Sequence, residues 1–438
     1  MKTPTKSCFS NALHLIEVEL EALTIPKREL RKHPAGQIAK IARSIERFGW
    51  VSPILVSPER EVIAGAARVK AALKLGLTRA PALQIDHLSP DQIRLYRLAD
   101  NRLAEEADWN REALRVEIAE LIEADLDIDL TGFEAGEIDV LLDFEDAAEP
   151  ELKDVPGDRE PSSKPGDAWR IGDHVLICGD ALDARTWEVL ADRTIDAAFV
   201  DSPYNVRIDK NVYGLGQVKH REFVQASGEM SRAEFSEFLR LAHERLFGAI
   251  KPGGVVFSCM DWRSIAALDE AGRTVGFELI NMVVWDKMTG GMGSLYRSQH
   301  ELICVFKKPG GAHRNNVQLG KHGRNRTNVW AYPGMNTGGA ERSELLSMHP
   351  TVKPVELVVD AIKDVTARGE TVVDCFGGSG TTMLAAQKAG RKSILIELDP
   401  VYCDTIIERM EAQTGLKAET WIGSDNTGAD KPEGVGHE

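Results

Sequence analysis

The sequence of 438 residues predicts an α/β protein: a small α+β domain followed by a larger domain on an open, mostly parallel sheet. Three observations lead to this fold class. Short apolar runs such as 195–200 alternate with amphipathic helical stretches. Two of these runs end in loops of unusual composition, 201–204 and 371–382. A stretch with four prolines among charged and small residues, 146–166, predicts a linker between the two parts.

Composition excludes several classes of protein. No apolar run approaches the roughly 18 residues that a membrane span needs, and residues 1–10 lack the apolar core of a signal peptide. The six cysteines form no C-x-x-C pair, so neither a zinc site nor a disulfide framework is indicated. We therefore expect a cytoplasmic protein with reduced thiols, no metal and no membrane partner.

The net charge of −15 is unevenly distributed along the chain. Residues 86–160 carry a net charge of −17, and the rest of the chain is close to neutral at +2. In contrast, residues 302–340 contain no acid and six lysines and arginines. A basic loop of this kind suits a phosphate backbone, although a solvated basic surface explains it equally well.

The N-terminal part alternates helices and short strands. A helix is predicted over 37–49, strands over 53–58 and 62–64, a helix over 65–76 and a strand over 81–86. This part also contains a spaced set of residues, namely Ile45, Gly49, Pro53, Ile54, Val56, Val62, Ile63, Ala64, Gly65, Arg68, Leu75, Gly76 and Pro81. With this set, about residues 15–105 resemble the N-terminal domain of the ParB/sulfiredoxin-like superfamily.

That resemblance implies a DNA-associated accessory domain, which in some members binds a nucleotide. Here two alanines stand between Gly65 and Arg68, where nucleotide-binding members carry side chains that engage phosphate. A small docking domain is therefore the favoured interpretation. Helices over 89–107, 110–123 and 137–144 follow it as an acidic appendage whose charge is expected to face solvent. The predicted plan is a first domain 1–105, an acidic helical connector 106–145, a linker 146–166, a second domain 167–425 and a disordered tail 426–438.

The first unusual loop of the second domain contains Asp201, Ser202, Pro203 and Tyr204. In open α/β sheets, ligands bind at the carboxyl ends of the strands. An acid, a proline-restricted backbone and an aromatic ring therefore meet where a ligand is expected. Taken alone, the tetrad is explained nearly as well by a Ser-Pro turn after a strand.

The second unusual loop follows a predicted strand, 371–374, and leads into a helix. Its glycines let the backbone approach a ligand at the start of the helix, as in nucleotide-type cofactor sites. Because the loop lacks a Gly-Lys-Ser/Thr ending, it is not a phosphate-binding P-loop. Glu397 ends the next predicted strand, where an acid can bind both hydroxyls of a ribose.

The second domain contains five motifs in the order Gly179–Leu182, Asp201–Asn205, Met348–Pro354, Asp374–Thr382 and Ile396–Pro400. With these motifs, about residues 167–423 resemble the amino-group DNA methyltransferases of the β class. The resemblance implies a Rossmann-like S-adenosylmethionine (AdoMet)-dependent domain with circularly permuted motif order. With the ParB-like domain in front, the chain is similar to a subgroup found in phages and prophages.

The resemblance implies a role for each residue of the tetrad. Asp201 accepts one N–H of an exocyclic amine and the Ser202 carbonyl the other, while Tyr204 stacks on the flipped base. The usual motif has proline in place of Ser202, but a backbone carbonyl survives that change and Pro203 still favours extended geometry there. The leading acid favours adenine N6. A cytosine-N4 enzyme is one alternative, and a ParB-like DNA-binding regulator with an inactive methyltransferase domain is another.

The resemblance also implies a set of AdoMet-binding residues, in which Asp180 accepts from the adenine amino group and the segment at His349 lines the methionine end. The set is Asp180, His349, Pro350, Thr351, Lys353, Asp374, Phe376, Gly377, Gly378, Ser379, Gly380, Thr381, Thr382 and Glu397.

The expected partner is double-stranded DNA. The hydrophilic stretch 286–300 is predicted to be an active-site loop, and about 307–345 is predicted to recognise the target sequence. A homodimer is implied only by resemblance, and the sequence does not reveal a cognate restriction enzyme. The expected DNA-binding residues are Lys307, Lys308, Arg314, Lys321, Arg324 and Arg326.

Overall fold

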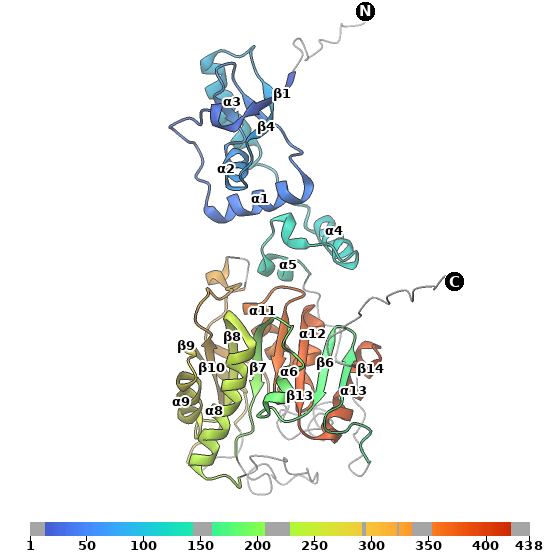
Figure 1. The fold of residues 1–438 in the computed structure, drawn as a ribbon. Helices are drawn as coiled ribbons and strands as arrows, with labels where there is room; N and C mark the ends of the chain where they lie inside the picture. Colours follow the sequence, from blue (N-terminus) through green and yellow to red (C-terminus); the bar gives the residue numbers. More distant parts are fainter. Residues whose placement is uncertain are drawn as a thin grey trace, which may run out of the picture. The chain divides into compact units, whose positions relative to one another are not determined.

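A computed structural model describes residues 14–142, 160–205, 228–290, 295–321, 324–334 and 353–421. The chain divides into two compact units, Met1–Glu134 and Ala135–Glu438 (Figure 1). Among the described residues, no helix is both long and apolar enough to cross a membrane.

The first unit contains a four-stranded sheet in the order β1-β4-β2-β3. Its core is aliphatic and joins strand residues such as Val18, Ile54 and Val62 to Val69 on a helix. The α+β fold class predicted for this part is confirmed. Its elements are β1 (His14–Glu19), η1 (Leu20–Ala22), α1 (Ala35–Phe48), β2 (Ile54–Val56), β3 (Val62–Ala64), α2 (Ala66–Lys74), β4 (Arg79–Gln84), α3 (Pro90–Leu103), α4 (Arg111–Glu123) and η2 (Ile128–Thr131).

Two sequence signals in this unit have clear structural causes. Ser89 forms a capping box with Gln92 at the start of α3, which explains why the helix begins there. The guanidinium of Arg68 donates to the carbonyl oxygens of Ser52 (2.6 Å) and Pro53 (2.9 Å). Arg68 thus ties α2 to the segment before β2.

The second unit contains a ten-stranded sheet in the order β11-β9-β10-β8-β7-β12-β13-β6-β5-β14. The pairs from β8 through β7, β12 and β13 to β6 are parallel, whereas β10 pairs antiparallel with both β8 and β9. The strands are β5 (Ala168–Ile171), β6 (His174–Cys178), β7 (Ile195–Asp201), β8 (Ile250–Met260), β9 (Glu278–Asp286), β10 (His300–Lys307), β11 (Val329–Ala331), β12 (Thr371–Asp374), β13 (Lys392–Glu397) and β14 (Ala418–Thr420).

Helices cover both faces of this sheet (Figure 1). Along β7, Phe199 joins the apolar cluster under α11, α12 and α13, while Ala198 and Val200 join the cluster under α6, α8 and α9. This alternation, with both faces buried, is typical of parallel α/β sheets and confirms the predicted fold class. The helices are α5 (Ala135–Leu142), α6 (Ala184–Glu188), α8 (Arg232–Ala249), α9 (Ile265–Thr274), η3 (Gln318–Gly320), α11 (Val355–Val365), α12 (Thr381–Ala389) and α13 (Pro400–Thr414).

The strand order creates a topological switch point between β7 and β12. The chain leaving β12 runs through α12 to β13 on one side, and the chain leaving β7 runs through α8 to β8 on the other. The two connections diverge at this edge, which is where open α/β sheets bind ligands. Both unusual loops found in the sequence begin here.

Helix α5 belongs to the second unit, although the sequence predicted it as part of an acidic appendage to the first domain. The carboxylate of Asp139 on α5 receives two hydrogen bonds from the guanidinium of Arg391, both 2.7 Å long. Both side chains are completely buried. The prediction that this acidic stretch faces solvent is therefore wrong at Asp139, because its charge is neutralised inside the protein.

The predicted linker 146–166 lies mostly outside the described residues. Its described end is attached to the second unit, since Ser163 Oγ donates to the carboxylate of Asp404 on α13 (2.6 Å). The Lys-Pro-Gly-Gly stretch at 251–254 has a composition typical of a turn, but these residues form part of β8.

Candidate active site

The tetrad Asp201–Tyr204 lies at the switch point. Asp201 is the last residue of β7 and is in register with Cys259 on β8. Tyr204 turns back toward the strand, and its hydroxyl lies 2.9 Å from Asp201 Oδ1. The aromatic ring predicted to stack on a base is therefore held beside the acid predicted to accept from its amine.

Lys353 brings a cation to this acid from just before α11. Its Nζ donates to Asp201 Oδ2 (2.7 Å) and to the Tyr204 hydroxyl oxygen (3.1 Å). The ammonium also lies 5.5 Å from the centre of the Tyr204 ring and 5.7 Å from that of Trp285. Lys353 was predicted to bind AdoMet, and in the structure its contacts among the described residues are with Asp201, Tyr204 and their neighbours.

A second acid, Glu301, completes the cluster and was not predicted. It stands at the start of β10, which runs antiparallel to β8 and therefore begins at the edge where β7 ends. Glu301 Oε2 lies 3.1 Å from Lys353 Nζ and 3.0 Å from the Tyr204 hydroxyl oxygen. Its other oxygen, Oε1, accepts from Lys287 Nζ at 2.5 Å. Lys287 belongs to the stretch predicted as an active-site loop.

Burial and the two lysines set the charge states of the acids. Burial raises the pKa of Asp201, and the Lys353 ammonium opposes the rise. Burial also acts to raise the pKa of Glu301, but Lys353 and Lys287 outweigh it and lower this pKa to about 2. Glu301 is therefore a carboxylate at neutral pH. Asp201 and Glu301 in turn raise the pKa of Lys353 against the effect of its burial.

Ser202 occupies the position where the usual motif has proline. Its side chain is buried, and its hydroxyl has no hydrogen-bond partner among the described residues. The hydroxyl thus adds no visible contact to the loop.

The glycine-rich loop follows β12, the strand next to β7. Asp374 ends β12, and its two carboxylate oxygens accept from the backbone N–H of Phe376 (3.1 Å) and the hydroxyl of Thr382 (2.6 Å). Burial raises the pKa of Asp374 to about 8. Asp374 thus links the start of the loop, at Phe376, to the first turn of α12, at Thr382.

Glu397 ends β13, the next strand along the edge. Its carboxylate accepts from the backbone N–H groups of Gly378 (2.7 Å) and Asp399 (2.9 Å). Burial raises the pKa of Glu397 to about 7, against these hydrogen bonds. Gly378 and Gly380 have φ angles of 51° and 80°, the left-handed region that glycine tolerates best.

Asp180 follows β6, which lies beside β13. The Gly179 N–H donates to the Glu397 carbonyl oxygen (2.9 Å), and the carboxylate of Asp180 accepts from the Leu182 N–H (2.8 Å). Four neighbouring strands therefore bring Asp201, Asp374, Glu397 and Asp180 to one edge of the sheet. The sequence predicted strand-end positions for Asp201, Asp374 and Glu397.

These residues fit AdoMet. Among the described residues, no Lys or Arg forms an ion pair with Asp374 or Glu397. Buried carboxylates without a cationic partner suit a cationic ligand. Each carboxylate oxygen has two lone pairs, so Glu397 can still accept from ribose hydroxyls. At Gly380, an added Cβ would lie 3.1 Å from Ile406 atoms, so the loop packs closely behind the site.

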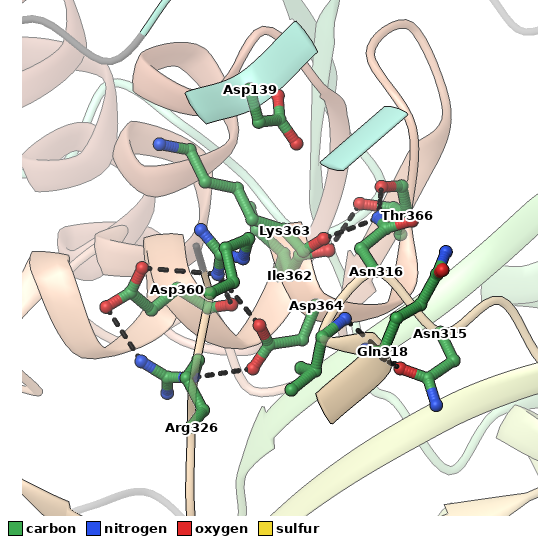
Figure 2. A network of polar contacts seen from close by, with 12 residues as sticks. Asp139, Asn315, Asn316, Gln318, Arg326, Asp360, Ile362, Lys363, Asp364 and Thr366 are labelled. Carbon is green, nitrogen blue, oxygen red and sulfur yellow. Dashed lines mark hydrogen bonds and ion pairs between the residues drawn. The ribbon is translucent and has the colours of Figure 1, made fainter. Parts of the chain in front are cut away.

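The predicted DNA-binding residues make contacts within the chain. Arg326 lies between Asp360 and Asp364 of α11 at 2.9 Å and 2.8 Å (Figure 2). Arg324 is buried and pairs with Asp364 at 2.8 Å. Lys308 donates to the carbonyl oxygens of Phe247 (2.5 Å) and Ile250 (2.8 Å).

The same segment is tied further to α11 and the sheet. Asn316 Nδ2 donates to the carbonyl oxygens of Lys363 and Thr366, both at 2.7 Å (Figure 2). Arg314 pairs with Glu370 at 3.0 Å, and Lys307 with Glu278 at 2.7 Å. These contacts provide a structural role for the basic residues, and their binding to DNA stays a prediction. Lys321 also has a partner within the chain.

The chain contains three regions that match known families. Residues 195–408 match the N6/N4 methyltransferase family, described as DNA methylase. The chain is a DNA methyltransferase of the N6/N4 family. This family uses AdoMet as its methyl donor and includes enzymes for both adenine and cytosine, so the family alone does not define the base. Residues 5–101 match the ParB N-terminal domain, and residues 112–165 match the ParB-methyltransferase HTH domain.

Curated relatives of the methyltransferase are type II enzymes. Methyltransferase M2.DpnII of Streptococcus pneumoniae is 28% identical over 50% of this chain and 84% of its own length. Methyltransferase M.HpaI of Haemophilus parainfluenzae is 26% identical over 55% of this chain and 75% of its own length. A putative DNA modification methylase from Thermus thermophilus is similar in structure, with 23% identity, a TM-score of 0.39, and coverage of 55% of this chain and 95% of its own.

The sequence interpretation missed one domain and one residue, and three of its predicted residues are not described by the structure. The sequence interpretation of 106–145 as an acidic connector did not include the HTH domain. His349, Pro350 and Thr351 lie outside the described residues, so the structure says nothing of them. Glu301 was missed because an acid beside an apolar run is typical of the end of any strand. Its place next to a predicted active-site loop was the available signal.

Proposed function

We propose that this methyltransferase transfers the methyl group of AdoMet to the exocyclic N6 amine of adenine in double-stranded DNA. The observation that carries the proposal is the adjacency of Asp201 at the end of β7 to Asp374 and Glu397 at the ends of β12 and β13. An acid that can accept a hydrogen bond from the amine of the base thus lies at the same edge of the sheet as two acids suited to the cationic methyl donor AdoMet.

The exocyclic amine of a base is a poor nucleophile because its lone pair is delocalised into the ring. Hydrogen-bond acceptors on both N–H groups localise the lone pair on nitrogen. Asp201 provides one acceptor and the Ser202 carbonyl the other. The side chain of Tyr204, held beside Asp201, provides the aromatic face for a base that has left the DNA stack.

AdoMet supplies an electrophilic methyl group on a sulfonium when bound. Glu397 would accept hydrogen bonds from the ribose hydroxyls of AdoMet, and Asp180 from its adenine amino group. Gly377, Gly378 and Gly380 would let the backbone of the loop lie close against the bound cofactor. Asp374 shapes that loop through its bonds to the Phe376 N–H and the Thr382 hydroxyl.

The leading acid of the tetrad supports adenine over cytosine as the target. The test is to express the chain in a host without DNA methylation and to sequence the genomic DNA with modification-sensitive long reads. N6-methyladenine at one short motif, lost in the Asp201→Ala variant, supports the proposal. If the modified base is N4-methylcytosine instead, the target is cytosine and the proposed adenine specificity is wrong. No modified base from a folded, AdoMet-binding protein would contradict the enzymatic function and favour a DNA-binding regulator.

A further inference from the structure

Asp201, Glu301 and Lys353 surround the Tyr204 hydroxyl. Their side chains are mostly inaccessible: Lys353 is 4% exposed, Glu301 11% and Asp201 18%. In such a site the number of hydrogen-bond donors and acceptors matters, because water does not replace a missing partner. Each carboxylate oxygen has two lone pairs, but an oxygen that already accepts from another group is a weaker acceptor, so Asp201 binds an amine best through an oxygen without another donor.

The Tyr204 hydroxyl has one proton and two acceptors at nearly equal distance. Asp201 Oδ1 lies 2.9 Å away and Glu301 Oε2 lies 3.0 Å away. If the hydroxyl donates to Asp201, it shares Oδ1 with the incoming amine and weakens this oxygen as an acceptor. If it donates to Glu301, Asp201 Oδ1 keeps its acceptor capacity.

Lys353 is shared between the same two acids. Its ammonium has three N–H donors, and the oxygens of Asp201 (2.7 Å), Tyr204 (3.1 Å) and Glu301 (3.1 Å) lie within reach. Lys287 binds the other oxygen of Glu301 at 2.5 Å and fixes this carboxylate in place. Glu301 thus competes with Asp201 for the single Tyr204 proton, whereas Lys353 can donate to both acids at once.

We propose that Glu301 is a positioning residue for methyl transfer: it takes the Tyr204 hydroxyl and shares the Lys353 ammonium, which leaves Asp201 an oxygen that accepts from the target amine. This inference rests on the proposed function and adds a residue outside the tetrad to it. Lys287 supports the same arrangement by orienting Glu301.

The first test compares Glu301→Gln with Glu278→Gln. Gln keeps the shape of residue 301 but removes its charge, so the hydroxyl and the ammonium turn to Asp201. We expect kcat for methyl transfer to DNA to fall about 10- to 100-fold, with KM for AdoMet within about twofold of the wild type. Glu278 of β9 pairs with Lys307 of β10, at the end of β10 that is far from Glu301. The Glu278→Gln variant should therefore match the wild type. An unchanged kcat in Glu301→Gln would overturn the proposal.

A double-mutant cycle with Tyr204→Phe separates positioning from general loss of structure. Phe keeps the ring but removes the hydroxyl for which the two acids compete. In that background, Glu301→Gln should lower kcat only about threefold or less. A cost equal to that in the wild-type background would contradict the role assigned to the hydroxyl. Lys287→Met, which loosens Glu301 but keeps its charge, is the second variant if Glu301→Gln does not fold, and we expect a kcat about threefold lower.

Crystal structures of the wild type and Glu301→Gln with AdoMet bound give a readout that does not depend on DNA methylation. In the wild type, the Tyr204 oxygen lies nearly equally far from Asp201 Oδ1 (2.9 Å) and Glu301 Oε2 (3.0 Å), and in the variant it should move away from residue 301 and toward Asp201. Unchanged distances in the variant would overturn the inference. A wild type that transfers no methyl group would contradict the proposed function, and the two structures would then decide the role of Glu301 alone.

Discussion

Three neighbouring strands, β7, β12 and β13, end in acids that are partly or fully buried, yet the surroundings of these acids are opposite. Asp201 at β7 lies against a lysine ammonium at 2.7 Å. Asp374 and Glu397 accept instead from neutral groups, backbone N–H groups and a hydroxyl. Charge is thus compensated within the protein at one place and only partly at the other.

The difference fits what each acid is proposed to bind. An acid that accepts from a neutral amine must carry its charge before the base arrives, and a neighbouring cation stabilises that charge. Acids that surround a cationic donor obtain their counter-charge from the ligand. Without it, burial raises the pKa of Asp374 to about 8 and that of Glu397 to about 7. Four predictions test this comparison.

The largest effect is expected from removing the acid of β7. Asp201→Asn keeps the size of the side chain but loses its charge, and we expect methyl transfer to fall at least about 1,000-fold. The affinity for AdoMet, measured by calorimetry, should change less than about threefold. Asp261→Asn is a matched control, since Asp261 follows the neighbouring β8 and pairs with Arg263. A loss of AdoMet affinity equal to the loss of transfer would remove the distinction between the two acidic places.

The acid of β13 should show the reverse pattern. Glu397→Gln weakens hydrogen bonds to the ribose hydroxyls, and we expect the dissociation constant of AdoMet to rise about 10- to 100-fold, equivalent to about 1.5–3 kcal/mol. At saturating AdoMet, kcat should recover to within about fivefold of the wild type. A variant with normal AdoMet affinity would show that Glu397 serves only to bind the backbone of the loop at Gly378.

Asp374, the acid of β12, should make the free energy of unfolding depend on pH. An unfolded aspartic acid has a pKa of about 3.9, and the folded value is about 8, so the folded protein retains this proton between the two values. Its stabilising contribution is complete below about pH 4 and is lost as the pH rises through about 8. Asp374→Asn removes this dependence.

We therefore expect the free energy of unfolding of Asp374→Asn, relative to the wild type, to increase by about 1–3 kcal/mol between pH 5 and pH 8.5. Chemical denaturation at several pH values without AdoMet measures it, and the variant should bind AdoMet weakly. A difference that is constant across this pH range would mean that Asp374 is already charged in the folded protein.

The smallest effect concerns Ser202. Its buried hydroxyl has no partner among the described residues, so Ser202→Ala should leave the free energy of unfolding equal or raise it by up to about 1 kcal/mol. Because the residue is expected to act through its backbone carbonyl, kcat should stay within about twofold. A larger fall in kcat would give the hydroxyl itself a part in binding the base.

The sequence alone determined the sheet, the order of its motifs and three of the acids at its edge. Period-two and period-3.6 patterns report which face of each element is buried, and an acid or glycine at a strand end needs no distant partner to be recognised. Asp201, Asp374 and Glu397 could therefore be predicted from their local surroundings.

Only the tertiary structure decided which charges meet. Glu301 is 100 residues from Asp201 in the sequence, and only the antiparallel pairing of β10 with β8 brings it to the same edge. The arginines of the acid-free segment likewise form ion pairs with α11, and Asp139 is buried against Arg391. Composition gives the number and sequence position of the charged residues. Which of them form ion pairs depends on strand order and packing, and no local sequence pattern contains that information.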